Sequence, residues 1–120
     1  MAAITAVQAK VTKTAAFNGA SLDISGITGD WTLVLKVDKL TAGKKARFTF
    51  EDSVDAFTAK IAGPSFSVKG EVAPEADRTF SVKKADFPSL RFGTGSAVLR
   101  LALTEIDASS SVDYEAWLEQ

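Results

Sequence analysis

The sequence predicts an all-β protein: an antiparallel β-sandwich, with a jelly roll as the preferred topology and an immunoglobulin-like sandwich as the alternative. Two observations support this prediction. Apolar and polar side chains alternate along most of the chain, which is the pattern of strands with one buried and one solvated face. Turn-forming glycines and prolines separate these segments at intervals of roughly 8–12 residues, and no long segment has the period of a helix.

The first strong alternation lies in residues 31–38, and it places Trp31 on the apolar face, in the expected core. Residues 46–51 repeat the pattern, with phenylalanines on the apolar face. The connection at residues 40–45 is short and contains Gly43, so it predicts a hairpin between these two strands.

Shorter alternating segments continue to the end of the chain. We therefore expect further strands at residues 57–61, 66–69, 80–83, 99–104 and 112–119. The resulting eight or nine strands are too many for a five-stranded OB barrel and suit two packed sheets.

The N-terminal residues 1–16 differ from the rest of the chain. They are rich in Ala, Thr and Val, contain Lys10 and Lys13 but no acid, and have Ile4 as a single large aliphatic side chain. We expect either an N-terminal arm, which would add to the sheet edge of a neighbouring molecule, or an edge strand of this one. Residues 17–120 then form a single β-sandwich domain.

The composition excludes several classes of function. The 120 residues contain no Cys and no His, which excludes disulfides, thiolate nucleophiles, Ser-His-Asp triads and ordinary transition-metal sites. A net charge of −1 is unsuited to neutralising the phosphates of a nucleic acid. No apolar run is long enough to span a membrane. We therefore expect neither an enzyme nor a cofactor.

An acidic cluster at residues 51–55 is the best candidate for a metal site. Glu51, Asp52 and Asp55 would supply three of the six to eight oxygens that calcium prefers. The order of these residues is not that of an EF-hand, so a solvated turn is the simpler interpretation. The other acids fall on outward-facing strand positions or in loops, which is unsuited to a catalytic pair of carboxylates.

Trp117 is the best candidate for a contact with a partner. It falls on the polar face of residues 112–119, between Glu115 and Glu119. A large ring on a polar face either covers an open end of the sandwich or meets a partner.

The charges are unevenly spread along the chain. Residues 1–47 carry seven basic and three acidic side chains, whereas residues 101–120 carry five acids and no base. This distribution favours docking on an oppositely charged neighbour, although a solvated edge protected by charge explains it as well. Our candidate partner contacts are Trp117, Glu115, Glu119, Ile4, Val7 and Lys10.

The segments at residues 31–37, 46–58, 97–101 and 112–118 resemble small virion proteins of tailed bacteriophages. The shared features are strand patterns, so no functional residue is carried over. The resemblance implies a structural β-sandwich protein that decorates or cements the capsid surface without catalysis. Its partners would be the major capsid protein and other virion proteins, with neither nucleic acid nor membrane, and a homo-oligomer is compatible with it. The implied location is the virion, after assembly in the host bacterial cytoplasm.

A carbohydrate-binding module is the alternative function, because a jelly roll suits it equally well. Such a module requires two or more coplanar exposed rings. The alternative therefore depends on whether Trp31 and Tyr114 are exposed or buried.

Overall fold

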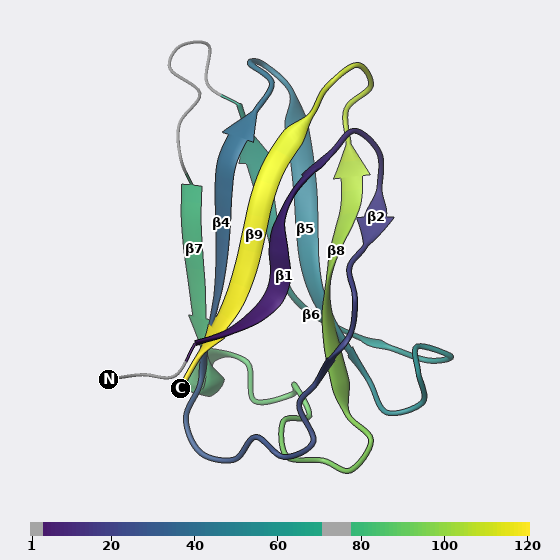
Figure 1. The fold of residues 1–120 in the computed structure, drawn as a ribbon, viewed down its shortest axis with the longest axis vertical. Helices are drawn as coiled ribbons and strands as arrows, with labels where there is room; N and C mark the ends of the chain where they lie inside the picture. The colour runs from purple at the N-terminus through teal and green to yellow at the C-terminus, as the bar shows by residue number, and fades with distance from the viewer. Residues whose placement is uncertain (1–3, 71–77) are drawn as a thin grey trace.

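Two antiparallel sheets pack face to face and form a β-sandwich (Figure 1). The structure is a computed structural model, and it describes residues 4–70 and 78–120. Sheet A has the strand order β1-β9-β4-β7, and sheet B has the order β2-β8-β5-β6, with β3 also paired to β8. The predicted all-β sandwich is confirmed.

The elements follow one another along the chain as β1 (Ile4–Lys13), β2 (Phe17–Asn18), β3 (Leu22–Asp23), β4 (Thr32–Leu40), β5 (Lys45–Ser53), β6 (Ile61–Lys69), β7 (Arg78–Lys83), the 3-10 helix η1 (Lys84–Asp86), β8 (Val98–Ile106) and β9 (Val112–Glu119).

The strands pair in a nested order. β1 pairs with β9, β2 and β3 pair with β8, β4 pairs with β7, and β5 pairs with β6. Strands from the first half of the chain therefore meet strands from the second half, from the outermost pair to the innermost. The additional pairs β4–β9 and β5–β8 join these ladders into two sheets. Most connections consequently cross from one sheet to the other.

The connection at residues 40–45 is one of these crossings, so the predicted hairpin is wrong. β4 ends at Leu40 in sheet A, and β5 begins in sheet B. The turn closes through a hydrogen bond from the Lys44 amide to the Thr41 carbonyl (3.0 Å). It is fixed to the end of β6 because the Gly70 amide donates to the Lys44 carbonyl (2.9 Å). Alternation locates a strand but does not identify its neighbour.

The predicted strand at residues 57–61 is also wrong, because residues 54–60 form a turn between β5 and β6. The Ser53 hydroxyl accepts a hydrogen bond from the Phe57 amide (2.9 Å), and its single proton is shared between the Ala59 carbonyl (2.6 Å) and the Asp55 carboxylate (2.7 Å). A serine side chain that satisfies nearby backbone groups competes with a sheet ladder. β6 therefore starts only at Ile61.

The core lies between the two sheets. Trp31 is buried, as predicted, and its ring stacks on Phe92 with 4.3 Å between the centroids. Tyr114 is fully buried and meets the ring of Phe48 edge-on, with 4.8 Å between the centroids. The largest fully buried side chains belong to Tyr114, Phe48, Phe50, Ile24, Leu33, Leu35, Leu99, Leu101, Leu103, Leu118, Val37 and Val112.

Candidate functional site

β1 is an edge strand of sheet A, which is one of the two alternatives predicted for residues 1–16. It pairs with β9 on one side, and no strand among the described residues pairs with its other side. Its ladder shifts register between Ala6 and Gln8 and again between Gln8 and Val11. Such irregularities re-aim side chains and increase the local twist. β1 thus offers an open edge and an irregular outer face beside β9.

A groove of about 380 Å³ lies over β1 and β9 and brings most of the predicted contact residues together. Ile4, Lys10, Glu115 and Trp117 all line it. Ile4 is 68% exposed, a large apolar side chain left open to solvent. The complete lining consists of Ile4, Ala6, Gln8, Ala9, Lys10, Glu115, Ala116 and Trp117.

A hydrogen bond and an ion pair hold two side chains of this groove, those of Trp117 and Lys10. The indole Nε1 of Trp117 donates to Oε1 of Glu119 at 2.9 Å, so Glu119 orients the ring from outside the groove. Trp117 lies opposite the small Ala6 in the β1–β9 register, and its ring is half-buried. The Lys10 Nζ lies 3.4 Å from Oδ2 of Asp38 on β4. The groove therefore combines an apolar patch with the ammonium of Lys10 and the carboxylate of Glu115.

Val7 is not part of this surface. It is 5% exposed and packs in the core, so the structure corrects its predicted role as a surface contact. Val7 follows Ala6, which lines the groove, so strand alternation turns Val7 to the opposite, buried face. With the register shifts on either side of Gln8, both Gln8 and Ala9 line the groove. Gln8 and Ala9 were not among the predicted contacts. Gln8 has the same alternation phase as Ile4 and Ala6, whereas Ala9 lies out of that phase and lines the groove beside a bulge.

The acidic cluster is not the solvated turn that the sequence predicted. Glu51 and Asp52 are both buried in β5. Glu51 accepts a hydrogen bond from Arg100 Nε (2.9 Å) and pairs with Lys60 Nζ (2.7 Å), while Asp52 pairs with Arg91 (2.7 Å). Consecutive strand residues point to opposite faces of a sheet, so these two carboxylates do not converge on one cation. No group of three potential metal ligands occurs within residues 4–70 and 78–120.

Asp55, the third acid of the cluster, has a structural role in the turn after β5. Its carboxylate accepts hydrogen bonds from the Ala59 amide (2.9 Å) and from the Ser53 hydroxyl (2.7 Å). These two bonds hold the pKa of Asp55 below its usual value, because they favour the charged form. Its charge thus stabilises the turn.

The two rings on which the carbohydrate alternative depends are not on the surface. Trp31 is 3% exposed, and Tyr114 is fully buried, so neither offers a face to a sugar. Trp117 is the half-buried ring of the groove. In the part of the chain that the structure describes, no helix is long and apolar enough to cross a membrane. Comparison with protein-family models, with curated proteins and with solved structures finds no match to this chain.

Proposed function

We propose that this chain is a structural virion protein that binds the capsid surface through β1 and the groove beside it. It decorates or stabilises the capsid without catalysing a reaction. Its partners are the major capsid protein and other virion proteins, and its location is the virion. The observation that carries the proposal is the exposed Ile4, which lies with Trp117 in one groove at an open sheet edge.

The four edges of the sandwich differ in their suitability for a partner. Three edges carry features that disfavour pairing with another strand. β2 and β3 have only two residues each, and β6 contains Pro64, which lacks an amide donor. β7 has six residues, with Arg78 at one end and Lys83 at the other. β1 has ten residues and contains neither Pro nor Gly. It is therefore the edge best suited to pair with an extended segment of a coat subunit.

The charge of β1 favours a different protein over a second copy at this edge. Lys10 and Lys13 are its charged side chains, and it carries no acid. Two β1 strands placed side by side would bring four ammonium groups together, and like charges across a ladder are destabilising. If the chain forms a homo-oligomer, we expect it to use another surface.

We also infer that the sandwich is a jelly roll. The nested pairing of β1 with β9, β2 and β3 with β8, β4 with β7, and β5 with β6 supports this topology, with β2 and β3 taken as one interrupted strand. In an immunoglobulin-like sandwich several consecutive strands pair as hairpins within one sheet. Here β5 and β6 are the consecutive strands that pair in this way.

A carbohydrate-binding module has less support. Trp117 supplies one half-buried ring to the groove, whereas sugar stacking of the kind expected requires a second ring coplanar with it. The buried positions of Trp31 and Tyr114 remove the two rings that the sequence offered for that role.

Binding to empty capsids tests the proposal. The wild-type chain is expected to co-sediment saturably, with an integral number of copies per capsomer. Ile4→Ser and Trp117→Ala should each weaken binding about tenfold, because central apolar anchors dominate interface energies. Thr58→Ala, in the turn after β5, is the control and should bind like wild type. Equal binding of all variants, or absence of the chain from purified particles by mass spectrometry, would overturn the proposal.

A further inference from the structure

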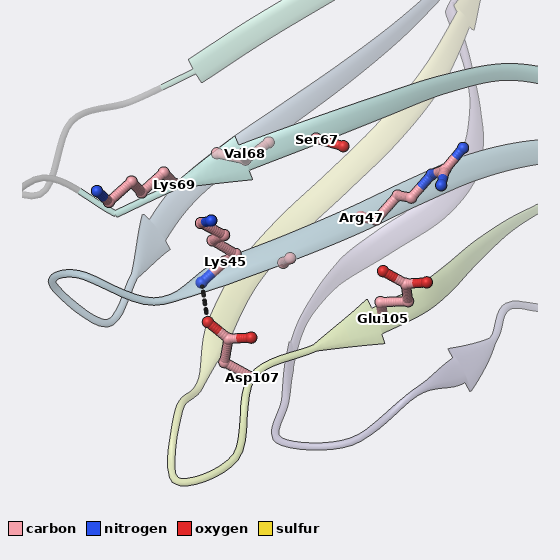
Figure 2. A pocket seen from close by; sticks show the side chains of 8 residues that line it. Lys45, Arg47, Ser67, Val68, Lys69, Glu105 and Asp107 are labelled. Carbon is pink, nitrogen blue, oxygen red and sulfur yellow. Dashed lines mark hydrogen bonds between the residues drawn. The ribbon is translucent and has the colours of Figure 1, made fainter.

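A second groove, of about 410 Å³, lies on sheet B where β5 begins and β6 ends (Figure 2). The groove over β1 and β9 belongs to sheet A, so the two grooves lie on different sheets. Its lining consists of Lys45, Ala46, Arg47, Ser67, Val68, Lys69, Glu105 and Asp107.

The strand register concentrates positive charge in this groove. Lys45 on β5 is paired directly with Lys69 on β6, and Arg47 is paired with Ser67. Side chains two residues apart share a face of a strand, so these four exposed side chains lie on the same outer face. Like charges directly opposite one another destabilise a sheet. The pairing of Lys45 with Lys69 therefore requires a compensating interaction.

Within residues 4–70 and 78–120, no ion pair involves the side chains of Lys45, Arg47 or Lys69. Other cations of the sandwich have acidic partners: Arg91 pairs with Asp52, and Arg100 pairs with Glu51. The contrast marks the cations of the second groove as available to a ligand.

The two acids of the groove lie on its other flank. Asp107 accepts a hydrogen bond from the backbone amide of Lys45 (2.9 Å), which fixes its carboxylate beside the start of β5. Glu105 on β8 is paired with Arg47 in the register of β5 and β8. Figure 2 shows both acids on the β8 side of β5, whereas Lys69 and Ser67 lie on the β6 side. The β5–β6 flank is therefore the positive one.

We propose that this flank binds a tetrahedral oxyanion of the phosphate or sulfate class. The ammonium groups of Lys45 and Lys69 and the guanidinium of Arg47 neutralise it, and the Ser67 hydroxyl donates a further hydrogen bond. A bound oxyanion removes the repulsion between the paired lysines and accepts charge-assisted hydrogen bonds from their ammonium groups. The exposed Arg47 side chain points away from Lys69 in Figure 2 and turns toward the ion when it binds. Arginine suits the role because its planar fork matches the oxygens of a phosphate. The site is independent of capsid binding.

The experiment is an NMR titration of the full chain, followed through the amide signals of Arg47, Ser67 and Lys69. Inorganic phosphate and inorganic sulfate represent the free ion, and a sugar phosphate represents the same group carried on a larger molecule. We expect saturable shifts confined to this groove, with a dissociation constant in the millimolar range. Tighter binding of the sugar phosphate than of either inorganic ion identifies an esterified group as the better ligand.

Two variants with the same change in net charge separate the site from general electrostatics. Lys45→Gln/Lys69→Gln should weaken phosphate binding about tenfold or more, since charge-assisted hydrogen bonds are lost. Lys83→Gln/Lys84→Gln, at the end of β7 and the start of η1, should leave it unchanged. Equal weakening in both variants, or shifts that spread over the surface without saturating, would overturn the proposal. So would binding of a poly-glutamate peptide in the groove without any response to phosphate.

A stability measurement tests the repulsion directly. At low ionic strength without phosphate, Lys69→Gln should raise Tm by about 2 °C, because it removes a like-charge cross-strand pair. An unchanged or lower Tm would contradict the premise that the paired lysines need an anion.

Discussion

Arg91 holds the fully buried carboxylate of Asp52 with both its side chain and its backbone. Its Nε and Nη2 lie 3.0 Å and 2.7 Å from Oδ1 of Asp52, and its backbone amide donates to Oδ2 at 2.7 Å. Asp52 lies in β5, whereas Arg91 lies in the connection between η1 and β8. The pair thus fixes an irregular connection to the C-terminal end of β5, an inner strand of sheet B.

The first prediction concerns this pair. Asp52→Asn should lower the free energy of unfolding by about 3 kcal/mol, because removing one partner leaves the other charge uncompensated. Urea denaturation measures the change. Lys10→Gln removes the exposed ammonium of the Lys10–Asp38 pair and is expected to cost less than about 1 kcal/mol. Equal effects of the two substitutions would contradict a stabilising role for the buried pair.

The second prediction concerns the hydroxyl of Tyr114. This group is buried and has no hydrogen-bond partner in the described part of the chain. Tyr114→Phe removes the unsatisfied hydroxyl and keeps the ring that packs on Phe48, so it should stabilise the fold by about 1 kcal/mol. A loss of stability in urea denaturation would show that the hydroxyl has a partner in solution.

The third prediction is that the titration of Tyr114 makes the stability of the fold depend on pH. Burial raises the pKa of Tyr114 from 10.0 to about 12. Between these values the unfolded chain releases the proton and the folded chain keeps it, so stability falls as pH rises. From pH 10 to pH 12 the free energy of unfolding of the wild type should fall by about 2–3 kcal/mol more than that of Tyr114→Phe. Below pH 10 the two chains should respond to pH in the same way. Parallel pH profiles for the two chains would contradict this assignment.

The fourth prediction concerns the contact between Gly70 and the end of β4. A Cβ at Gly70 would collide with the carbonyl oxygens of Leu40, 2.7 Å away, and of Thr41. Gly70→Ala should therefore cost about 2 kcal/mol, since backbone atoms must move to admit the methyl group. Gly26→Ala is the matched control, because its Cβ would meet nothing within 4 Å. Similar melting temperatures for both variants would show that the connection between β4 and β5 shifts to admit the methyl group at little cost in stability.

The fifth prediction separates an integral strand from a loose arm at the N-terminus. Val7→Ala should lower the free energy of unfolding by about 2 kcal/mol, because it removes buried methyl groups from the core. Thr5→Ala, at an exposed position of the same strand, should be close to neutral. Equal small effects would indicate that β1 detaches readily, as an arm would.

Much of the strand content followed from the sequence. Alternation located β4, β5, β8 and β9 to within about two residues, because the side-chain period of a strand is a local property. It failed at residues 57–61, where Ser53 satisfies the backbone groups of a turn, and it missed the bulges of β1. Local hydrogen bonds and register shifts leave no periodic trace.

The candidate site was predictable only in part. Trp117 was a candidate because its large ring falls on the polar face of the predicted strand at residues 112–119. The structure places it in the groove with Ile4, Lys10 and Glu115. The second groove had no such signal, since Lys45 and Lys69 are separated along the chain and meet only through the β5–β6 register.

The sequence by itself determined that this protein is built from antiparallel strands with one apolar face each, and that it lacks the Cys and His of many catalytic and metal sites. The tertiary structure decided which strands are neighbours, that Glu51 and Asp52 are buried in ion pairs, and that two lysines face each other across a ladder. The division has a physical reason. Pleating and composition are local, whereas burial and register depend on contacts between residues far apart in the chain.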